Sequence, residues 1–185
     1  TLAVLHGCLL PNSLPRFKRL DADKLWNAAT LIGRARPDVA EVAGRLAFEL
    51  RSQLPPVDDF VCLHGDVHPK NSIARNGQVT LIDLDQAAAG PAAADLGSLL
   101  AALRYNRCVG SISESDESAL AESFLSGYRQ MQPLPDAESL RWHVAAALLA
   151  ERALRSVNRI RPEGLLHLRE LLSNAREILC GEGHS

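Results

Sequence analysis

Apolar residues recur at the spacing of an α-helix over most of the chain. One apolar stripe includes Leu25, Trp26 and Ile32, another follows Pro37, and a later one includes Leu120. Glycine and proline separate these stripes, as they do at the ends of helices. We expect helices over residues 1–6, 21–32, 37–54, 94–105, 113–128, 136–159 and 162–179. The stripes should form the core, so the pattern predicts a mainly α-helical protein.

Only a short central part of the chain is expected to be extended. Residues 60–63 form one apolar run, and residues 79–82 form a second. Between them lies Asn76-Gly77, a pair that favours a tight type I′ turn. We therefore expect the two strands to fold back on each other as a small hairpin. The small residues over 86–91 should let the backbone pass close to another segment.

Polar side chains follow each of these strands. His64 and Asp66 come after the first strand, Asn71 follows Asp66 by five residues, and Asp83 and Asp85 end the second strand. The hairpin should therefore gather the acidic groups and the Asn at one end of a small sheet. Because Asp83 follows a strand that we expect to be buried, its carboxylate would be costly without a metal ion or an ion pair.

The spacing of Asp66, Asn71 and Asp83 matches the catalytic loop of kinases. In kinases an Asp accepts the proton of the attacking hydroxyl, and an Asn that follows it binds a metal ion. An Asp on the next hairpin binds Mg²⁺ at the nucleotide phosphates. Carboxylate and amide oxygens are ligands that Mg²⁺ prefers. We therefore interpret Asp66 as the catalytic base, and Asn71 and Asp83 as Mg²⁺ ligands.

The wording of these motifs resembles the aminoglycoside phosphotransferase and choline kinase-like family. The similar motifs are His64-Gly-Asp66-x-His68-x-x-Asn71, Ile82-Asp83-x-Asp85 and Asp95-Leu-Gly97. The resemblance covers about residues 60–105, which we take as the catalytic segment. It implies a protein-kinase-like fold, here its helical C-terminal lobe with a small catalytic β-hairpin. It also implies ATP- or GTP-dependent transfer of phosphate to a hydroxyl of a small molecule, such as an aminoglycoside, a sugar or an amino alcohol.

The same resemblance implies roles for the other motif residues. Asp85 could bind the substrate or a second metal ion, or be a solvated loop carboxylate. His68 could contact the substrate or simply line the loop. His64 should hold the loop through hydrogen bonds to the backbone. Asp95, at the start of a helix, should cap that helix and brace the catalytic loop.

Charged residues outside the motifs give opposite indications about the substrate. Acidic residues over 114–122 could attract a cation, but acidic side chains in a first helical turn are favoured by the helix dipole alone. In contrast, Arg152, Arg155, Arg159 and Arg161 could recognise an anionic sugar or a phosphate, or could be solvated. The sequence therefore leaves the substrate open.

Length and composition define the broad class of protein. The chain has 185 residues, of which 46% are hydrophobic and 23% charged, which is typical of one soluble domain or lobe. Its net charge of -2 gives no reason to expect nucleic acid or an anionic membrane as a partner. The four cysteines form no C-x-x-C pair, so we expect buried, reduced thiols and a cytoplasmic protein. No apolar run is long enough to predict a membrane span.

The first 60 residues lack the sequence features of a nucleotide-binding lobe. They contain neither a Gly-rich phosphate loop nor a lysine on a strand. We therefore expect residues 1–185 to be a single C-terminal lobe, inactive when isolated, with the nucleotide-binding lobe in the full-length protein. With that lobe included, the fold would be α+β.

Two other functions remain open. His64-x-Asp66-x-His68 could hold a metal ion in a metallohydrolase, because alternate residues of an extended segment lie on one face. That function would leave Asn71 and Asp83 without a role. The chain could instead be a non-catalytic pseudoenzyme or a docking lobe, although such a protein should have lost part of the catalytic set.

Overall fold

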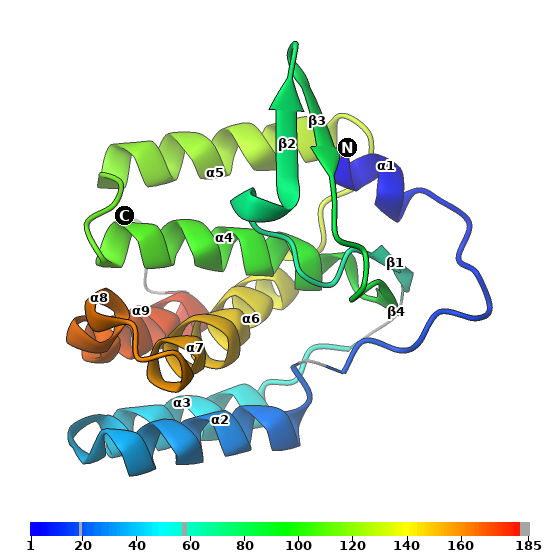
Figure 1. Ribbon diagram of the computed structural model, residues 1–185. Helices are drawn as coiled ribbons and strands as arrows, with labels where there is room; N and C mark the ends of the chain where they lie inside the picture. Colours follow the sequence, from blue (N-terminus) through cyan, green and yellow to red (C-terminus); the bar gives the residue numbers. More distant parts are fainter. Residues whose placement is uncertain (19, 57–58, 182–185) are drawn as a thin grey trace.

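The computed structural model describes residues 1–18, 20–56 and 59–181, and this part of the chain is mainly helical, as predicted (Figure 1). The helices are α1 (Leu2–His6), α2 (Ala22–Ala35), α3 (Ala40–Ser52), α4 (Ala92–Cys108), α5 (Glu114–Arg129), α6 (Ala137–Ala147), α7 (Leu154–Asn158), α8 (Pro162–Leu166) and α9 (Leu168–Cys180). The strands are β1 (Val61–Leu63), β2 (Ser72–Arg75), β3 (Gln78–Leu81) and β4 (Ala88–Gly90). Short 3₁₀ turns cover Pro37–Val39 and Pro69–Asn71.

Two of the expected helices are interrupted. The helix expected over 136–159 contains a π-helical turn, Leu148–Ala153, between α6 and α7. Leu148, Leu149 and Glu151 of this wider turn are buried. The last helix is broken at His167, between α8 and α9.

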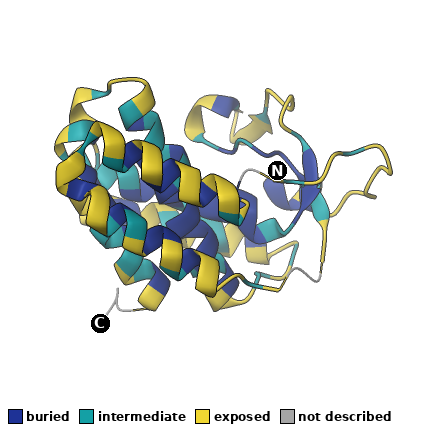
Figure 2. Cartoon of the chain, turned by 90° about the horizontal axis from the view of Figure 1, so that it is seen from below, coloured by how far each residue is buried: buried dark blue, intermediate teal, exposed yellow. Residues whose placement is uncertain are grey.

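The main core lies where α2, α3, α6 and α9 pack together, and buried residues follow the inner faces of the helices (Figure 2). Ile32 and Leu50 are fully buried there, and the Trp142 Nε1 donates a hydrogen bond of 2.8 Å to the Leu50 carbonyl oxygen. The prediction that Trp26 and Leu120 are core residues is wrong, because their side chains are 48% and 49% exposed. Each lies at the edge of its apolar stripe, where neighbouring helices no longer cover it.

A smaller apolar cluster fixes the segment that follows β1. It joins Leu2 and Ala3 of α1, Val67 of that segment, Leu96 of α4 and Tyr128 of α5. Each of these residues is less than a tenth exposed, and burying an aliphatic side chain of this size contributes about 1.5–3 kcal/mol. The segment from His64 to Asn71 is therefore anchored by three helices that are distant in sequence.

The strands form two separate antiparallel pairs. In one pair Arg75 of β2 lies opposite Gln78 of β3, so Asn76 and Gly77 alone form the turn, with φ angles of 50° and 74°. The predicted type I′ turn is confirmed. Its two-residue loop forces β3 to pair with the residues directly before the turn. The hairpin expected between residues 60–63 and 79–82 is therefore wrong.

β1 pairs instead with β4, a strand that the sequence analysis did not predict. Val61 lies opposite Gly90, and a Cβ added to Gly90 would lie 2.7 Å from the Leu63 Cδ1. The expected close approach of residues 86–91 to another segment is therefore confirmed, and that segment is β1.

Other general expectations have mixed outcomes. All four cysteines are free; Cys108 is buried and Cys62 half-buried, but Cys8 and Cys180 are exposed, so the expectation of buried thiols is wrong for these two.

Among the described helices, none combines the length and the apolar character needed to cross a bilayer.

Candidate active site

Asp95 holds the segment after β1 from inside the fold. Its side chain, in the first turn of α4, is almost fully buried, and its Oδ2 and Oδ1 accept hydrogen bonds of 2.7 and 2.9 Å from the backbone N–H groups of His64 and Gly65. His6 of α1 adds a third contact, with its Nε2 3.1 Å from Asp95 Oδ2. These three donors compensate for burial of the carboxylate.

Tyr128 of α5 completes this buried network. Its hydroxyl lies 2.8 Å from His6 Nδ1, and burial raises the pKa of Tyr128 to about 12, so the hydroxyl stays protonated and can donate. His6 then carries its proton on Nε2 and donates it to Asp95. Sequence reasoning missed His6 and Tyr128, which it placed only in a helix end and an apolar stripe.

The network supports the role predicted for Asp95 in bracing the loop, but not in capping the helix. Pro91 occupies the N-cap position of α4, and no side chain caps that end. Both carboxylate oxygens of Asp95 are directed to the loop instead. The capping part of the prediction is therefore wrong.

His64 links the loop to the segment that follows β3. Its fully buried ring accepts a hydrogen bond from the Asp66 backbone N–H at Nδ1 (3.4 Å), and its Nε2 lies 2.9 Å from the Ile82 carbonyl oxygen. With Nδ1 as acceptor, Nε2 carries the proton and donates it to Ile82. Both ring nitrogens are engaged, which supports the predicted holding role.

Asn71 is hydrogen-bonded both to Asp66 and to the residue before Asp83. Its Nδ2 donates to the Asp66 carbonyl oxygen (3.0 Å) and lies 3.4 Å from Asp66 Oδ2. Its backbone carbonyl oxygen accepts a hydrogen bond of 3.0 Å from Ile82 N–H, and Asp83 is the next residue. The side-chain nitrogen is therefore engaged, and the amide oxygen is the atom left to bind a cation.

Asp83 is exposed, which contradicts the expectation that it follows a buried strand. β3 ends at Leu81, which packs against the smaller apolar cluster, but the far end of the hairpin projects beyond the helices (Figure 1), and Val79 and Ile82 are 47% and 38% exposed. The argument from the cost of burial is therefore wrong. A different signal replaces it: Asp83 has a φ angle of 65°. A residue other than glycine in this region costs about 1–3 kcal/mol, and such residues cluster at functional sites.

The carboxylate of Asp66 lies between two different groups. Its Oδ2 faces Asn71, whereas its Oδ1 accepts a hydrogen bond of 3.2 Å from Arg155 Nη2 of α7. The two side chains are 21% and 27% exposed, so this ion pair is partly shielded from water. Arg155 is therefore a residue of the site, although its sequence neighbourhood did not distinguish it from a solvated arginine.

His68 lies beside Asp66, with its Nε2 3.7 Å from Asp66 Oδ2. Its Nδ1 accepts a hydrogen bond of 3.2 Å from the Lys70 backbone N–H. Burial lowers the pKa of His68, and although Asp66 opposes this, nearby cations including Arg152 lower it further. The ring is therefore neutral near pH 7 and presents an Nε2–H group toward the carboxylate.

The oxygen donors of Asn71 and Asp83 fit Mg²⁺ better than zinc. Carboxylate and amide oxygens suit a hard cation that keeps waters and phosphate oxygens in its shell. A zinc site of the His64-x-Asp66-x-His68 type does not form, because both nitrogens of His64 are engaged elsewhere. Within the described ranges, no three His, Cys, Asp or Glu side chains are grouped to hold a metal ion.

Asp85 is exposed and lines a hollow of about 260 Å³ together with Lys18, Lys24 and Gly65, the residue before Asp66. Its predicted contact with the substrate or a second metal ion stays a prediction.

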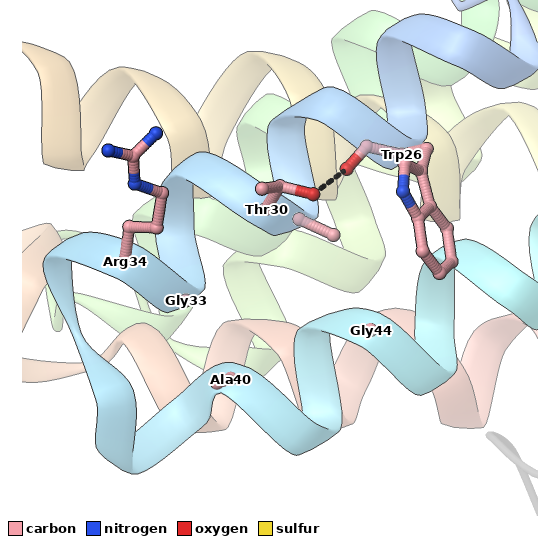
Figure 3. A pocket seen from close by; sticks show the side chains of 7 residues that line it. Trp26, Thr30, Gly33, Arg34, Ala40 and Gly44 are labelled. Carbon is pink, nitrogen blue, oxygen red and sulfur yellow. Dashed lines mark hydrogen bonds between the residues drawn. The ribbon is translucent and has the colours of Figure 1, made fainter.

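Another hollow, of about 250 Å³, lies between α2 and α3 (Figure 3). Trp26, Thr30, Gly33 and Arg34 line it, and the Thr30 hydroxyl donates a hydrogen bond of 2.9 Å to the Trp26 carbonyl oxygen. These two helices contribute no residue to the catalytic loop. The hollow is therefore not part of the candidate site.

Comparison with known proteins identifies one matching family. The model of a family described as "Phosphotransferase enzyme family" matches residues 1–143. The match includes every motif residue from His64 to Asp95 and ends before the π turn and Arg155. No curated protein is similar enough to the chain to count as a match.

Proposed function

Because the chain belongs to the phosphotransferase enzyme family, we propose that it transfers phosphate from ATP, or from GTP, to a hydroxyl group of a small molecule. Phosphotransferases of this kind generally use Mg²⁺ with the nucleotide. In this proposal the described helices are the C-terminal lobe of a protein-kinase-like fold. A nucleotide-binding lobe in the full-length protein stays a prediction.

In the proposed reaction the Asp66 carboxylate accepts the proton of the acceptor hydroxyl as the hydroxyl oxygen attacks the terminal phosphorus, and the bond from that phosphorus to the bridging oxygen breaks to release the nucleoside diphosphate. Arg155 and Asn71 hold the two oxygens of that carboxylate in place. Because the transition state of phosphoryl transfer is loose, most of the acceleration comes from such positioning and from neutralising charge. Because the His68 ring is neutral, Asp66 carries the only charge of this neighbouring pair. We therefore assign the role of proton acceptor to Asp66.

Asn71 and Asp83 would hold the Mg²⁺, which when bound would neutralise charge on the phosphate oxygens. One observation carries this assignment. The hydrogen bond from Ile82 N–H to the Asn71 carbonyl oxygen joins the two motif segments, while Asn71 also contacts Asp66. The three groups that the kinase spacing selects are thereby joined through one residue.

The test is nucleotide-dependent phosphate transfer by the full-length protein to a panel of hydroxylated small molecules, followed by ³¹P NMR. Asp66→Asn and Asp83→Asn should each reduce turnover on the order of 10³-fold or more, comparable to the loss of one charge-stabilising group in other phosphotransferases. Asp23→Asn, at an exposed position on α2, is the matched control. Near-normal turnover in both site variants would contradict the assignment, and nucleotide binding without any transfer would favour a docking lobe.

A further inference from the structure

A strongly basic hollow of about 250 Å³ opens beside Asp66, on the side of Arg155. Elements that are distant in sequence build it: the catalytic loop, α4, the π turn, α7 and the residues before α8. Its Lys, Arg, Asp and Glu side chains are five cations and one carboxylate, namely Lys70, Arg152, Arg155, Arg159, Arg161 and Glu151. Five like charges around so small a volume repel one another unless an anion lies between them.

The carboxylates at this hollow are already committed. Glu151 is buried, accepts a hydrogen bond of 2.6 Å from the Ser98 hydroxyl and lies 3.7 Å from Arg152 Nη2. Asp66 pairs with Arg155. In the described part of the chain, no acidic side chain pairs with Arg159 or Arg161, although both line the hollow. The excess positive charge is therefore not neutralised by acidic side chains of the described residues.

Arg152, which lines the hollow, has an unsatisfied buried donor of its own, as does Arg141 elsewhere. Its Nε is buried and has no hydrogen-bond partner among the described residues, whereas its Nη2 donates to the Ser98 carbonyl oxygen at 2.9 Å. Burial lowers the pKa of Arg152, and the positive charges of Arg155 and Arg161 add to this effect against the opposing charges of Glu151 and Asp66. The π turn holds the side chain in this unfavourable place, and π-helical turns are frequent at functional sites.

We propose that this hollow binds an anionic group of the acceptor, a phosphate or a carboxylate, and so places a hydroxyl of the same molecule at Asp66. Guanidinium groups bind such anions through paired hydrogen bonds, which fix orientation as well as position. The role given to the hydroxyl rests on the proposed function. The anion site itself rests on the charges, on Arg152 and on the shape of the hollow. A cationic acceptor such as an aminoglycoside would face five like charges.

The geometry assigns the hollow to the acceptor and not to the nucleotide. Asn71 lies at Asp66 Oδ2, and its backbone carbonyl oxygen is bonded to Ile82, the residue before Asp83, so a nucleotide chelated by Mg²⁺ through Asn71 and Asp83 belongs there. Arg155, at Oδ1, lines the basic hollow, as does His68, whose Nε2 lies 3.7 Å from Oδ2. An acceptor anchored in the hollow would therefore reach the carboxylate from the side of Arg155 and His68, beside the metal ligands.

Calorimetric titration of the full-length protein with four compounds of one carbon skeleton tests the proposal. The compounds are glycerol 3-phosphate, glycerate, glycerol and 3-aminopropane-1,2-diol, which are anionic, anionic, neutral and cationic. We expect the two anionic compounds to bind and the other two to bind at least about tenfold more weakly. Phosphate and carboxylate as the natural anchor are distinguished by which of the first two binds more tightly.

Arg159→Gln and Arg161→Gln should each weaken binding of the preferred anion by about tenfold or more, since each removes a charge-assisted contact. Arg45→Gln on α3 is the matched control, because Arg45 is exposed and its pairing is a loose 3.7 Å contact with Glu41. Circular dichroism melting of each variant checks that the fold is retained.

Several outcomes would overturn the proposal: no binding of either anion, equal binding of the cationic compound, or unchanged affinity in both pocket variants. A loss of affinity for Mg²⁺·ADP in Arg159→Gln and Arg161→Gln would assign the hollow to the nucleotide and overturn it as well. If the anions bind through Arg159 but no acceptor is phosphorylated, the anion site stands and the phosphotransferase proposal fails. If only neutral or cationic acceptors are phosphorylated, the phosphotransferase proposal stands and the proposed anion site for the acceptor fails.

Discussion

Replacing Asp95 by Asn should destabilise the protein through a defined loss at the base of the catalytic loop. The carboxylate accepts from two buried backbone N–H groups, those of His64 and Gly65, at 2.7 and 2.9 Å. An Asn side chain has one oxygen, so one of these N–H groups would face an NH₂ donor. An unsatisfied buried donor costs about 1–3 kcal/mol, and loss of charge assistance at the remaining bond adds about 1 kcal/mol. The expected cost is therefore about 3 kcal/mol.

Urea denaturation of wild-type and Asp95→Asn proteins measures this cost directly. In thermal denaturation, the unfolding midpoint of Asp95→Asn should be lower by about 6–12 °C for a chain of this length. Hydrogen exchange should show the His64 and Gly65 amides losing protection first. Asp21→Asn is the control, since Asp21 precedes α2 without a capping hydrogen bond from its side chain. A change below about 0.5 kcal/mol in Asp95→Asn, the size of an ordinary surface substitution, would refute this account of the loop.

Two further predictions concern other buried or constrained positions. Burial lowers the pKa of His143 to about 4, so its neutral form is favoured in the folded state. Because the unfolded chain binds the proton more readily, the stability from this group is present above pH 6.5 and is lost as the pH falls toward 4. Between pH 7 and 5, wild-type protein should lose about 2 kcal/mol more than His143→Gln in urea denaturation; equal losses would contradict this. Gly65→Ala should abolish proposed activity, because the new methyl group would overlap the Gln86 backbone at a φ of 79°. Gly77 has a φ of 74° and open space around it, so Gly77→Ala should lower stability by only about 1 kcal/mol and keep activity. If Gly65→Ala and Gly77→Ala have equal effects in activity and melting assays, the contact with Gln86 is unimportant.

Local patterns in the sequence predicted what depends on neighbouring residues. The type I′ turn at Asn76-Gly77 is confirmed because its conformation is set by two residues. The start of α5 is also set locally, by a capping box: Ser113 Oγ accepts from Asp116 N–H, and Asp116 Oδ2 accepts from Ser113 N–H, both at 3.1 Å. The helical periods placed most helices correctly for the same reason.

Contacts between distant segments could not be predicted in this way. Arg155 and Asp66 are 89 residues apart in sequence, as are His6 and Asp95, and no local period relates them. The pairing of β1 with β4 depends on small residues that carry no strand signal. The exposure of Asp83 depends on whether another layer covers the hairpin. The apolar residues of the strand before Asp83 do not predict whether such a layer is present. The motif itself identified the residue types, and tertiary packing supplied their partners.

The exposed hairpin of β2 and β3 should open more easily than the rest of the site. An isolated two-stranded ribbon is marginally stable in water, whereas the segment with Asp66 is embedded among helices. Opening of β2 and β3 should therefore require less free energy than unfolding of the helical body. Asp83 would stay attached to the catalytic loop during such opening, because the residue before it, Ile82, is hydrogen-bonded to His64 and Asn71. The hairpin can thus fray without separating the residues proposed for catalysis.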